Sequence, residues 1–179
     1  MGKVFRTIHI NLSLFFLPLA LLYAVTGAFY LSGFNQDSGA KVWSFSSPMI
    51  PKSEIPNVIN RWLSENHLKP ILQTELKKGK NNTLIMGSAS YSASIQSDKD
   101  GLKVEIIKRS LLGNLIMLHK GKAKWYFDVL AYGFAFSMLV FYFSGLVMTK
   151  FCNKRRKQAL SVMFLGFFVA CIVGYLSLQ

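Results

Sequence analysis

The chain has 179 residues, of which 51% are hydrophobic, and a formal net charge of +13 at pH 7. The apolar residues gather into three long blocks around a polar middle, which excludes an ordinary soluble protein and indicates about three transmembrane helices. No zinc-finger spacing or basic recognition helix accompanies the positive charge, and this disfavours a nucleic-acid-binding protein.

The first apolar block runs from about Ile8 to Leu31 and contains no charged residue. At about 1.5 Å per residue, a helix of this length crosses roughly 30 Å of hydrocarbon. Lys3 and Arg6 precede it, as in a signal peptide, but the apolar run is longer than the roughly 7–15 residues of a cleavable signal. We therefore predict an uncleaved transmembrane helix over residues 8–31, with a kink at Pro18.

The polar middle of the chain predicts one small domain of helix and sheet. Residues 33–50 are rich in Gly, Ser and Pro, which indicates a linker. A helical pattern begins at Ser53-Glu-Ile-Pro56 and ends by Pro70, because its apolar residues recur at helix spacing. Residues 51–110 are thus expected to form an α+β domain, and residues 111–124 an amphipathic connection.

Short strands are expected after this helix, since β-branched and aromatic residues stand between turn signals. The segment Ser97-Asp-Lys-Asp-Gly101 is typical of a hairpin turn. The strand candidates are Ile71–Leu76, Thr83–Gly87, Ser90–Ser97 and Leu102–Lys108.

Two further transmembrane helices are predicted, over residues 125–151 and 159–178. The first of them begins with Trp125 and Tyr126, which suit the headgroup level of a bilayer. Small residues in the apolar blocks, at Thr26-Gly27, Ser144-Gly145 and Gly166, favour close helix packing.

The orientation follows from the positive charges beside the apolar blocks. Residues 152–158 form a basic loop, which is expected in the cytoplasm, and Lys3 and Arg6 agree with this placement. The domain and its flanks, residues 33–124, would then lie outside, in the periplasm of a Gram-negative cell. Three lysines at the outer end of the second block oppose this orientation: Lys120, Lys122 and Lys124.

Neither cysteine stands in a pattern that predicts chemistry. Cys152 and Cys171 lie in no CxxC or CxxCH motif, so we expect two unpaired thiols and no covalent haem attachment. Nucleophile–base pairs and phosphate-binding glycine loops are also not evident, so hydrolase and nucleotide-enzyme functions have no positive support.

The three histidines divide into two at membrane boundaries and one in the domain. His9 begins the first apolar block and His119 precedes the second, so each is either an interfacial polar residue or a metal ligand. His67, at the end of the domain helix, is expected to be an exposed helix-end residue.

Asp128 is the acidic residue one turn inside the second apolar block. An ionisable group at the centre of a membrane helix costs about 2.5–3.5 kcal/mol, and less near the surface. The carboxylate could pair with Lys124 on the same helix face. It could instead relay a proton or a metal ion, or orient a histidine. Both interpretations stay open.

Several segments together resemble the PepSY-associated transmembrane helix family. They are Phe5-Arg-Thr-Ile-His9, Val25-Thr-Gly-Ala28, Leu118-His-Lys-Gly121 and Phe143-Ser-Gly-Leu146, with the helix-plus-strand domain between them. The resemblance covers residues 5–150. It implies a bacterial inner-membrane protein with a periplasmic PepSY-like domain, related to haem-bearing siderophore and ferric reductases and to accessory proteins of ferrous iron uptake.

By this resemblance, His9 and His119 match membrane histidines that ligate haem b. Asp128 is a candidate catalytic residue on a separate ground, because it is an ionisable group inside a membrane segment. The larger reductases carry more membrane histidines and more helices. In this chain the two histidines lie at opposite ends of a span of roughly 30 Å, so one monomer cannot place both on one haem iron. A two-fold homodimer could, with one haem between two copies of His9 and another between two copies of His119.

Two classes of function follow. The first is electron transfer that helps reduce ferric iron at the outer face, with a donor supplied from elsewhere because no NAD or flavin site is evident. Residues 33–124 hold 14 Lys/Arg and 7 Asp/Glu, a formal charge of +7 that suits anionic ferric chelates, although it also suits a solvated or lipid-contacting face. The alternative is a cofactor-free accessory or assembly protein whose PepSY-like domain binds an envelope partner or restrains a protease.

Overall fold

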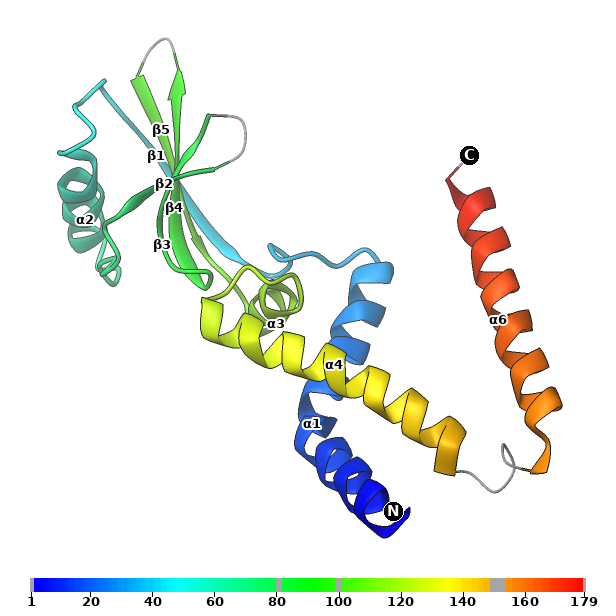
Figure 1. Cartoon of the computed structure of the whole chain (residues 1–179). Coiled ribbons are helices and arrows are strands. Elements are labelled where there is room, and N and C mark those ends of the chain that lie inside the picture. The colour runs from blue at the N-terminus through cyan, green and yellow to red at the C-terminus, as the bar shows by residue number, and fades with distance from the viewer. Residues whose placement is uncertain (1, 80–81, 99–100, 149–153, 179) are drawn as a thin grey trace. The chain divides into compact units, whose positions relative to one another are not determined.

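The computed structural model describes residues 2–79, 82–98, 101–148 and 154–178 (Figure 1). The chain divides into two compact units. One is Leu21–Val129, and the other combines Met1–Ala20 with Leu130–Gln179. Residues 149–153 lie outside the described part of the chain; they include Cys152, the start of the predicted basic loop and the end of the helix predicted over residues 125–151. Residues 99–100 of the predicted hairpin turn lie outside it too.

The unit Leu21–Val129 is built on one antiparallel five-stranded sheet, visible in Figure 1. The strand order is β1-β5-β4-β3-β2, so the last four strands form a meander and the first strand adds to its final edge. The strands are β1 (Lys41–Ser47), β2 (Leu76–Lys78), β3 (Leu84–Gly87), β4 (Tyr91–Asp98) and β5 (Gly101–Lys108).

The domain core lies between one face of this sheet and helix α2 (Ile55–Glu65). Antiparallel register aligns apolar side chains into rows across the strands, and α2 covers them with its buried face, because side chains alternate between sheet faces. Trp62 of α2 stacks on Phe45 of β1, with ring centroids 4.5 Å apart. The fully buried members are Ile55, Ile59, Leu63, Ile71, Met86, Ala93, Ile95, Val104 and Ile106.

The predicted linker over residues 33–50 is wrong for residues 41–47. These residues form strand β1, which pairs with β5 from Lys41↔Lys108 to Ser47↔Leu102. Trp43 and Phe45 alternate with polar residues and turn their rings towards the core. The serines of this segment suggested a linker, but in β1 Ser44 and Ser46 occupy the exposed face of an edge strand.

The strand predicted over Ile71–Leu76 is also wrong except at its last residue. The backbone of Ile71 bonds to a helix side chain instead of a neighbouring strand. Its N–H donates to Asn60 Oδ1 (2.9 Å), and its carbonyl accepts from Asn60 Nδ2 (3.2 Å). The amide of Asn60 thus satisfies both backbone groups and buries Ile71 under α2, and β2 begins only at Leu76.

Helix α3 (Leu111–His119) forms the segment that was expected to be a connection. The Ser110 hydroxyl caps it by accepting from Gly113 N–H (3.0 Å), and it donates to Ser38 O (2.7 Å). Gly113 lies so close to Gln36 O that a β-carbon would collide with it. The turn around Ser38 and the start of α3 are therefore fixed against each other.

Three helices of the described chain are long and apolar enough to cross a membrane: α1 (Gly2–Leu31), α4 (Trp125–Met148) and α6 (Arg156–Ser177). Together with the small antiparallel sheet and its helices, they confirm the predicted fold class. In the second unit, Phe16 of α1 is buried beside Gly133 and Phe134 of α4. Cys171 on α6 is an exposed free thiol.

Candidate functional site

His119 lies at the C-terminal end of α3, within the unit Leu21–Val129, and packs on the last turns of α1. Its Nδ1 is 2.6 Å from the hydroxyl oxygen of Thr26, and its ring centroid is 4.6 Å from that of Tyr23. A β-carbon on Gly27 would be 3.6 Å from His119 Cε1. A hydroxyl, an aromatic ring and bare backbone thus surround the imidazole.

The Thr26 hydroxyl has a second bond that is local to its own helix. It donates to the carbonyl of Leu22, with an oxygen–oxygen distance of 2.6 Å. This i to i−4 bond is common for Thr in apolar helices, because it satisfies the hydroxyl without water. Thr26 is only 1% exposed, so its oxygen meets the imidazole in a dry environment.

His9 has a similar environment in the other unit. Its Nδ1 is 2.8 Å from the hydroxyl oxygen of Ser144 on α4, and its ring meets Phe141 edge to face at 5.1 Å. The Ser144 hydroxyl is 3.1 Å from the carbonyl of Phe141, to which it donates. Ser144 is 4% exposed. The two histidines therefore share one arrangement: an aromatic neighbour and a buried hydroxyl at Nδ1.

This arrangement determines which metal chemistry the histidines suit. In the described part of the chain, no hydrogen bond engages the Nε2 atom of either imidazole. A neutral imidazole with Nδ1 hydrogen-bonded is the usual form of a histidine that binds a metal through Nε2. The described residues hold no group of three or more His, Cys, Asp or Glu that could bind a metal ion. In each histidine the bond at Nδ1 thus leaves Nε2 as the ring atom that could act as a ligand.

Asp128 lies near the His119 environment rather than in an ion pair with Lys124. The ion pairs among the described residues are Lys77–Glu75, Lys103–Glu105 and Arg109–Asp37. The half-buried Asp128 carboxylate lies beside Gly121 and interacts electrostatically with Tyr23. Tyr23 therefore contacts the His119 ring and is also within the field of Asp128.

Sequence reasoning found the histidines but missed the residues that hold them. Thr26 and Ser144 were interpreted as small packing residues, and Tyr23 was not singled out. The available signal was a pattern that both sites share. In each, a hydroxyl residue stands directly before a glycine inside an apolar helix, at Thr26-Gly27 and at Ser144-Gly145. His67 is exposed just after α2, as predicted for a helix-end residue. Its backbone is in the left-handed region, with φ 55°.

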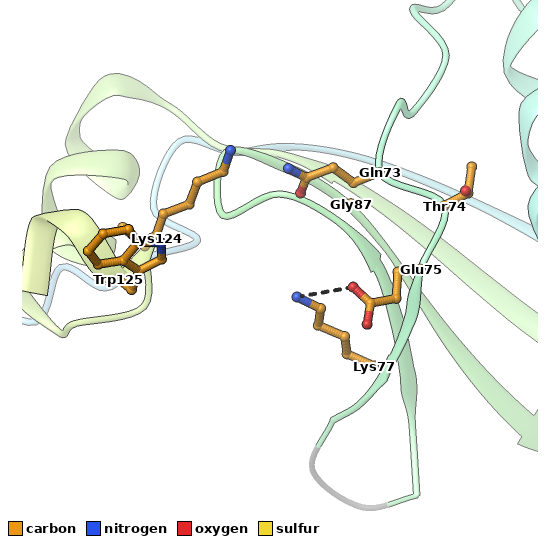
Figure 2. A pocket seen from close by; sticks show the side chains of 8 residues that line it. Gln73, Thr74, Glu75, Lys77, Gly87, Lys124 and Trp125 are labelled. Carbon is orange, nitrogen blue, oxygen red and sulfur yellow. Dashed lines mark ion pairs between the residues drawn. The ribbon is translucent and has the colours of Figure 1, made fainter.

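A cavity of about 580 Å³ opens beside the sheet, at the start of α4 (Figure 2). Figure 2 shows Lys124 and Trp125 on one side of it and the segment around β2 on the other. Lys77 there pairs with Glu75 at 3.6 Å, and both side chains are mostly exposed. The lining residues are Gln73, Thr74, Glu75, Lys77, Gly87, Ala123, Lys124 and Trp125.

A family model described as PepSY_TM-like matches residues 3–179. The match includes the membrane helices, the α+β domain and both histidine environments. No curated protein and no solved structure matches the chain.

Proposed function

Because the chain belongs to the PepSY_TM-like family, we propose that it assists bacterial iron acquisition by haem-linked electron transfer across the inner membrane. The observation that supports this proposal is the pair of histidines, His9 on α1 and His119 at the end of α3, each bonded through Nδ1 to a buried hydroxyl. Among the described residues, no hydrogen bond engages either Nε2. A bound haem b would supply one-electron chemistry, while the protein supplies ligands, orientation and electrostatics.

His9 and His119 would each hold a separate haem. Along α1, His9 and Thr26 are 17 positions apart, which corresponds to about 25 Å at the helical rise, so one haem cannot reach both environments. One chain offers one imidazole at each position, and a bis-histidine haem needs two. Two copies related by a two-fold axis would supply the second imidazole at each.

Asp128 would act on the outer side, where the domain meets α4. Its position beside Gly121, with an electrostatic interaction with Tyr23, suits a group that holds a proton or an iron ion close to the His119 environment. A carboxylate in this setting could also keep a positive charge near the membrane surface. As part of the proposal, we assign to Asp128 the role of holding a proton or an iron ion there.

The substrate would be an anionic ferric chelate. The +7 charge of residues 33–124 favours anions, and the cavity of about 580 Å³ is within the usual size of small-molecule sites, about 300–1,000 Å³. Lys77 and Lys124 line that cavity, against the single carboxylate of Glu75. This cavity is therefore the place where we expect such a chelate to bind.

The test is a reduced-minus-oxidised absorption spectrum of the full chain, purified in detergent from cells with ample haem. A b-type signal is expected that decreases in His9→Ala and in His119→Ala, because each removes one class of axial ligand. His67→Ala is the matched control, since His67 is exposed in the domain, and it should keep the full signal. Protein without haem under these conditions would overturn the proposal and favour a cofactor-free accessory protein that binds a partner.

A further inference from the structure

We propose that Thr26 and Ser144 are positioning residues that hold His119 and His9 in the Nδ1–H tautomer, so that each Nε2 carries a free lone pair. The use of that lone pair for iron rests on the function proposed above. The tautomer itself does not, because it follows from the hydrogen bonds of this chain.

The argument at His119 counts the hydrogens on one hydroxyl. Thr26 has a single hydroxyl hydrogen, and the carbonyl of Leu22, at 2.6 Å, can only accept a hydrogen bond. The hydrogen therefore points to Leu22, and the Thr26 oxygen is left as an acceptor towards Nδ1 at 2.6 Å. An acceptor at Nδ1 requires a hydrogen on Nδ1. A neutral imidazole then has none on Nε2.

The same count holds at His9. The Ser144 hydroxyl donates to the carbonyl of Phe141 at 3.1 Å, which leaves its oxygen to accept from Nδ1 of His9 at 2.8 Å. The longer bond to the carbonyl makes this assignment weaker than the one at His119. We therefore expect a complete tautomer preference at His119 and a smaller one at His9.

Burial makes these bonds decisive. Thr26 and Ser144 are 1% and 4% exposed, so water has little access to take the place of either hydroxyl. A buried donor without a partner is strongly unfavourable, because its lost hydrogen bond to water is not replaced. In the other tautomer the proton sits on Nε2. Nδ1 and the hydroxyl oxygen would then face each other as two acceptors while the hydroxyl hydrogen stays directed to the carbonyl.

The direct test is nitrogen NMR of the haem-free full chain in detergent with 15N-labelled histidine, in which the two ring nitrogens of each tautomer have separate shifts. Wild-type His119 and His9 should show protonated Nδ1 and unprotonated Nε2. His67 is exposed and provides the reference for a mixture set by water. Protonated Nε2 at His119 in the wild type would overturn the proposal without any variant.

Variants separate the two sites. Thr26→Val has nearly the same shape but no hydroxyl, so it should turn His119 into a tautomer mixture and leave His9 unchanged. Ser144→Ala should do the reverse, so each variant is the control for the other. Thr26→Ser keeps the hydroxyl that Thr26→Val lacks, so His119 should keep protonated Nδ1 in this variant. If Thr26 only filled space, the valine variant, which is closer in shape, would be the better tolerated of the two. An unchanged His119 spectrum in Thr26→Val would contradict the proposal.

The haem-loaded protein distinguishes this inference from the proposed function. If haem is bound, Thr26→Val should weaken haem affinity about 10- to 100-fold and shift the midpoint potential of one haem only, the usual range for loss of a residue that orients a ligand. If no haem binds but the NMR pattern holds, the electron-transfer proposal fails and the tautomer assignment stands. If haem binds and affinity is unchanged in Thr26→Val, the positioning role is wrong.

Discussion

The β-carbon position of Gly27 lies 3.6 Å from Cε1 of His119, so the imidazole rests almost directly on the backbone of α1. Glycine is therefore part of the histidine environment, together with the Thr26 hydroxyl that precedes it. The contact brings the end of α3 against the C-terminal part of α1 within one compact unit.

Gly27 variants should distinguish this contact from general helix packing. At 3.6 Å an added methyl group makes an ordinary van der Waals contact, so Gly27→Ala should keep any signal assigned to His119. Gly27→Leu would place further carbons where the ring lies, and should remove that signal while the His9 signal stays. Haem spectra of the two variants and of His119→Ala are the measurement, and equal spectra for Ala and Leu would contradict the contact.

The contact of Gly133 with Phe16 predicts a stability effect in the other unit. A β-carbon on Gly133 would be 3.4 Å from Phe16 Cζ, and Phe16 is 7% exposed. Gly133→Leu should therefore overpack α1 against α4 and lower stability by about 1–3 kcal/mol. Ala135→Leu is the control, because Ala135 is exposed on the same helix. The readout is thermal unfolding in detergent, and equal losses in both variants would exclude a specific contact.

Arg109 joins three segments of the domain. Its Nη1 donates to Ala89 O at 2.7 Å, and its Nε is 3.3 Å from Asp37 Oδ1, an ion pair whose geometry is not that of a hydrogen bond. The side chain is 12% exposed. Arg109→Met should lower the free energy of unfolding by about 1–3 kcal/mol, because it removes the hydrogen bond to the half-buried Ala89 carbonyl and the ion pair with Asp37.

The control for Arg109→Met is Lys108→Met, which removes an exposed charge at the neighbouring position. Urea unfolding of the full chain in detergent, followed by tryptophan fluorescence, measures both. Similar midpoints for the two variants would show that the net charge, and not the contacts of Arg109, sets the effect.

Tyr91 predicts a dependence of stability on pH. Burial raises the pKa of its hydroxyl, which donates to Lys69 O at 3.0 Å. The folded state thus holds this proton more strongly than the unfolded chain does. Its contribution is complete below the ordinary tyrosine pKa of about 10 and is lost as pH rises through the folded-state pKa.

The measurement compares wild type with Tyr91→Phe in urea at increasing pH. The stability difference between them should decrease only above about pH 10, in the direction given by the raised pKa. Subtraction removes the titration of the lysines, which both proteins share. A difference that stays constant over this range would show that the hydroxyl does not titrate with folding.

The proposed orientation predicts thiol accessibility in intact cells. With Cys171→Ser as background, Cys152 should react with a membrane-impermeant maleimide only after the cells are opened, because the basic loop is expected in the cytoplasm. Ser53→Cys, an exposed domain position, made together with Cys152→Ser and Cys171→Ser, should react in intact cells. Reaction of Cys152 in intact cells would reverse the assigned orientation.

The three membrane helices could be predicted because long apolar runs are a local property of the chain. Strands β3, β4 and β5 could be predicted for the same reason, because each is a short alternating run bounded by turn signals. Their observed bounds agree with the expected ones. The pattern failed at β1 and at Ile71. Residues 41–47 form a strand because they pair with β5, which is distant in sequence. At Ile71 a single asparagine amide, that of Asn60, takes the backbone bonds that a strand would need.

The sequence by itself therefore determined the number of membrane helices, the class of the domain and the two histidines worth testing. Only the tertiary structure paired His119 with Thr26, 93 positions away, and His9 with Ser144, 135 positions away. Such pairs depend on how each helix is rotated about its axis, which the packing of neighbouring helices sets and which no local pattern of residues encodes.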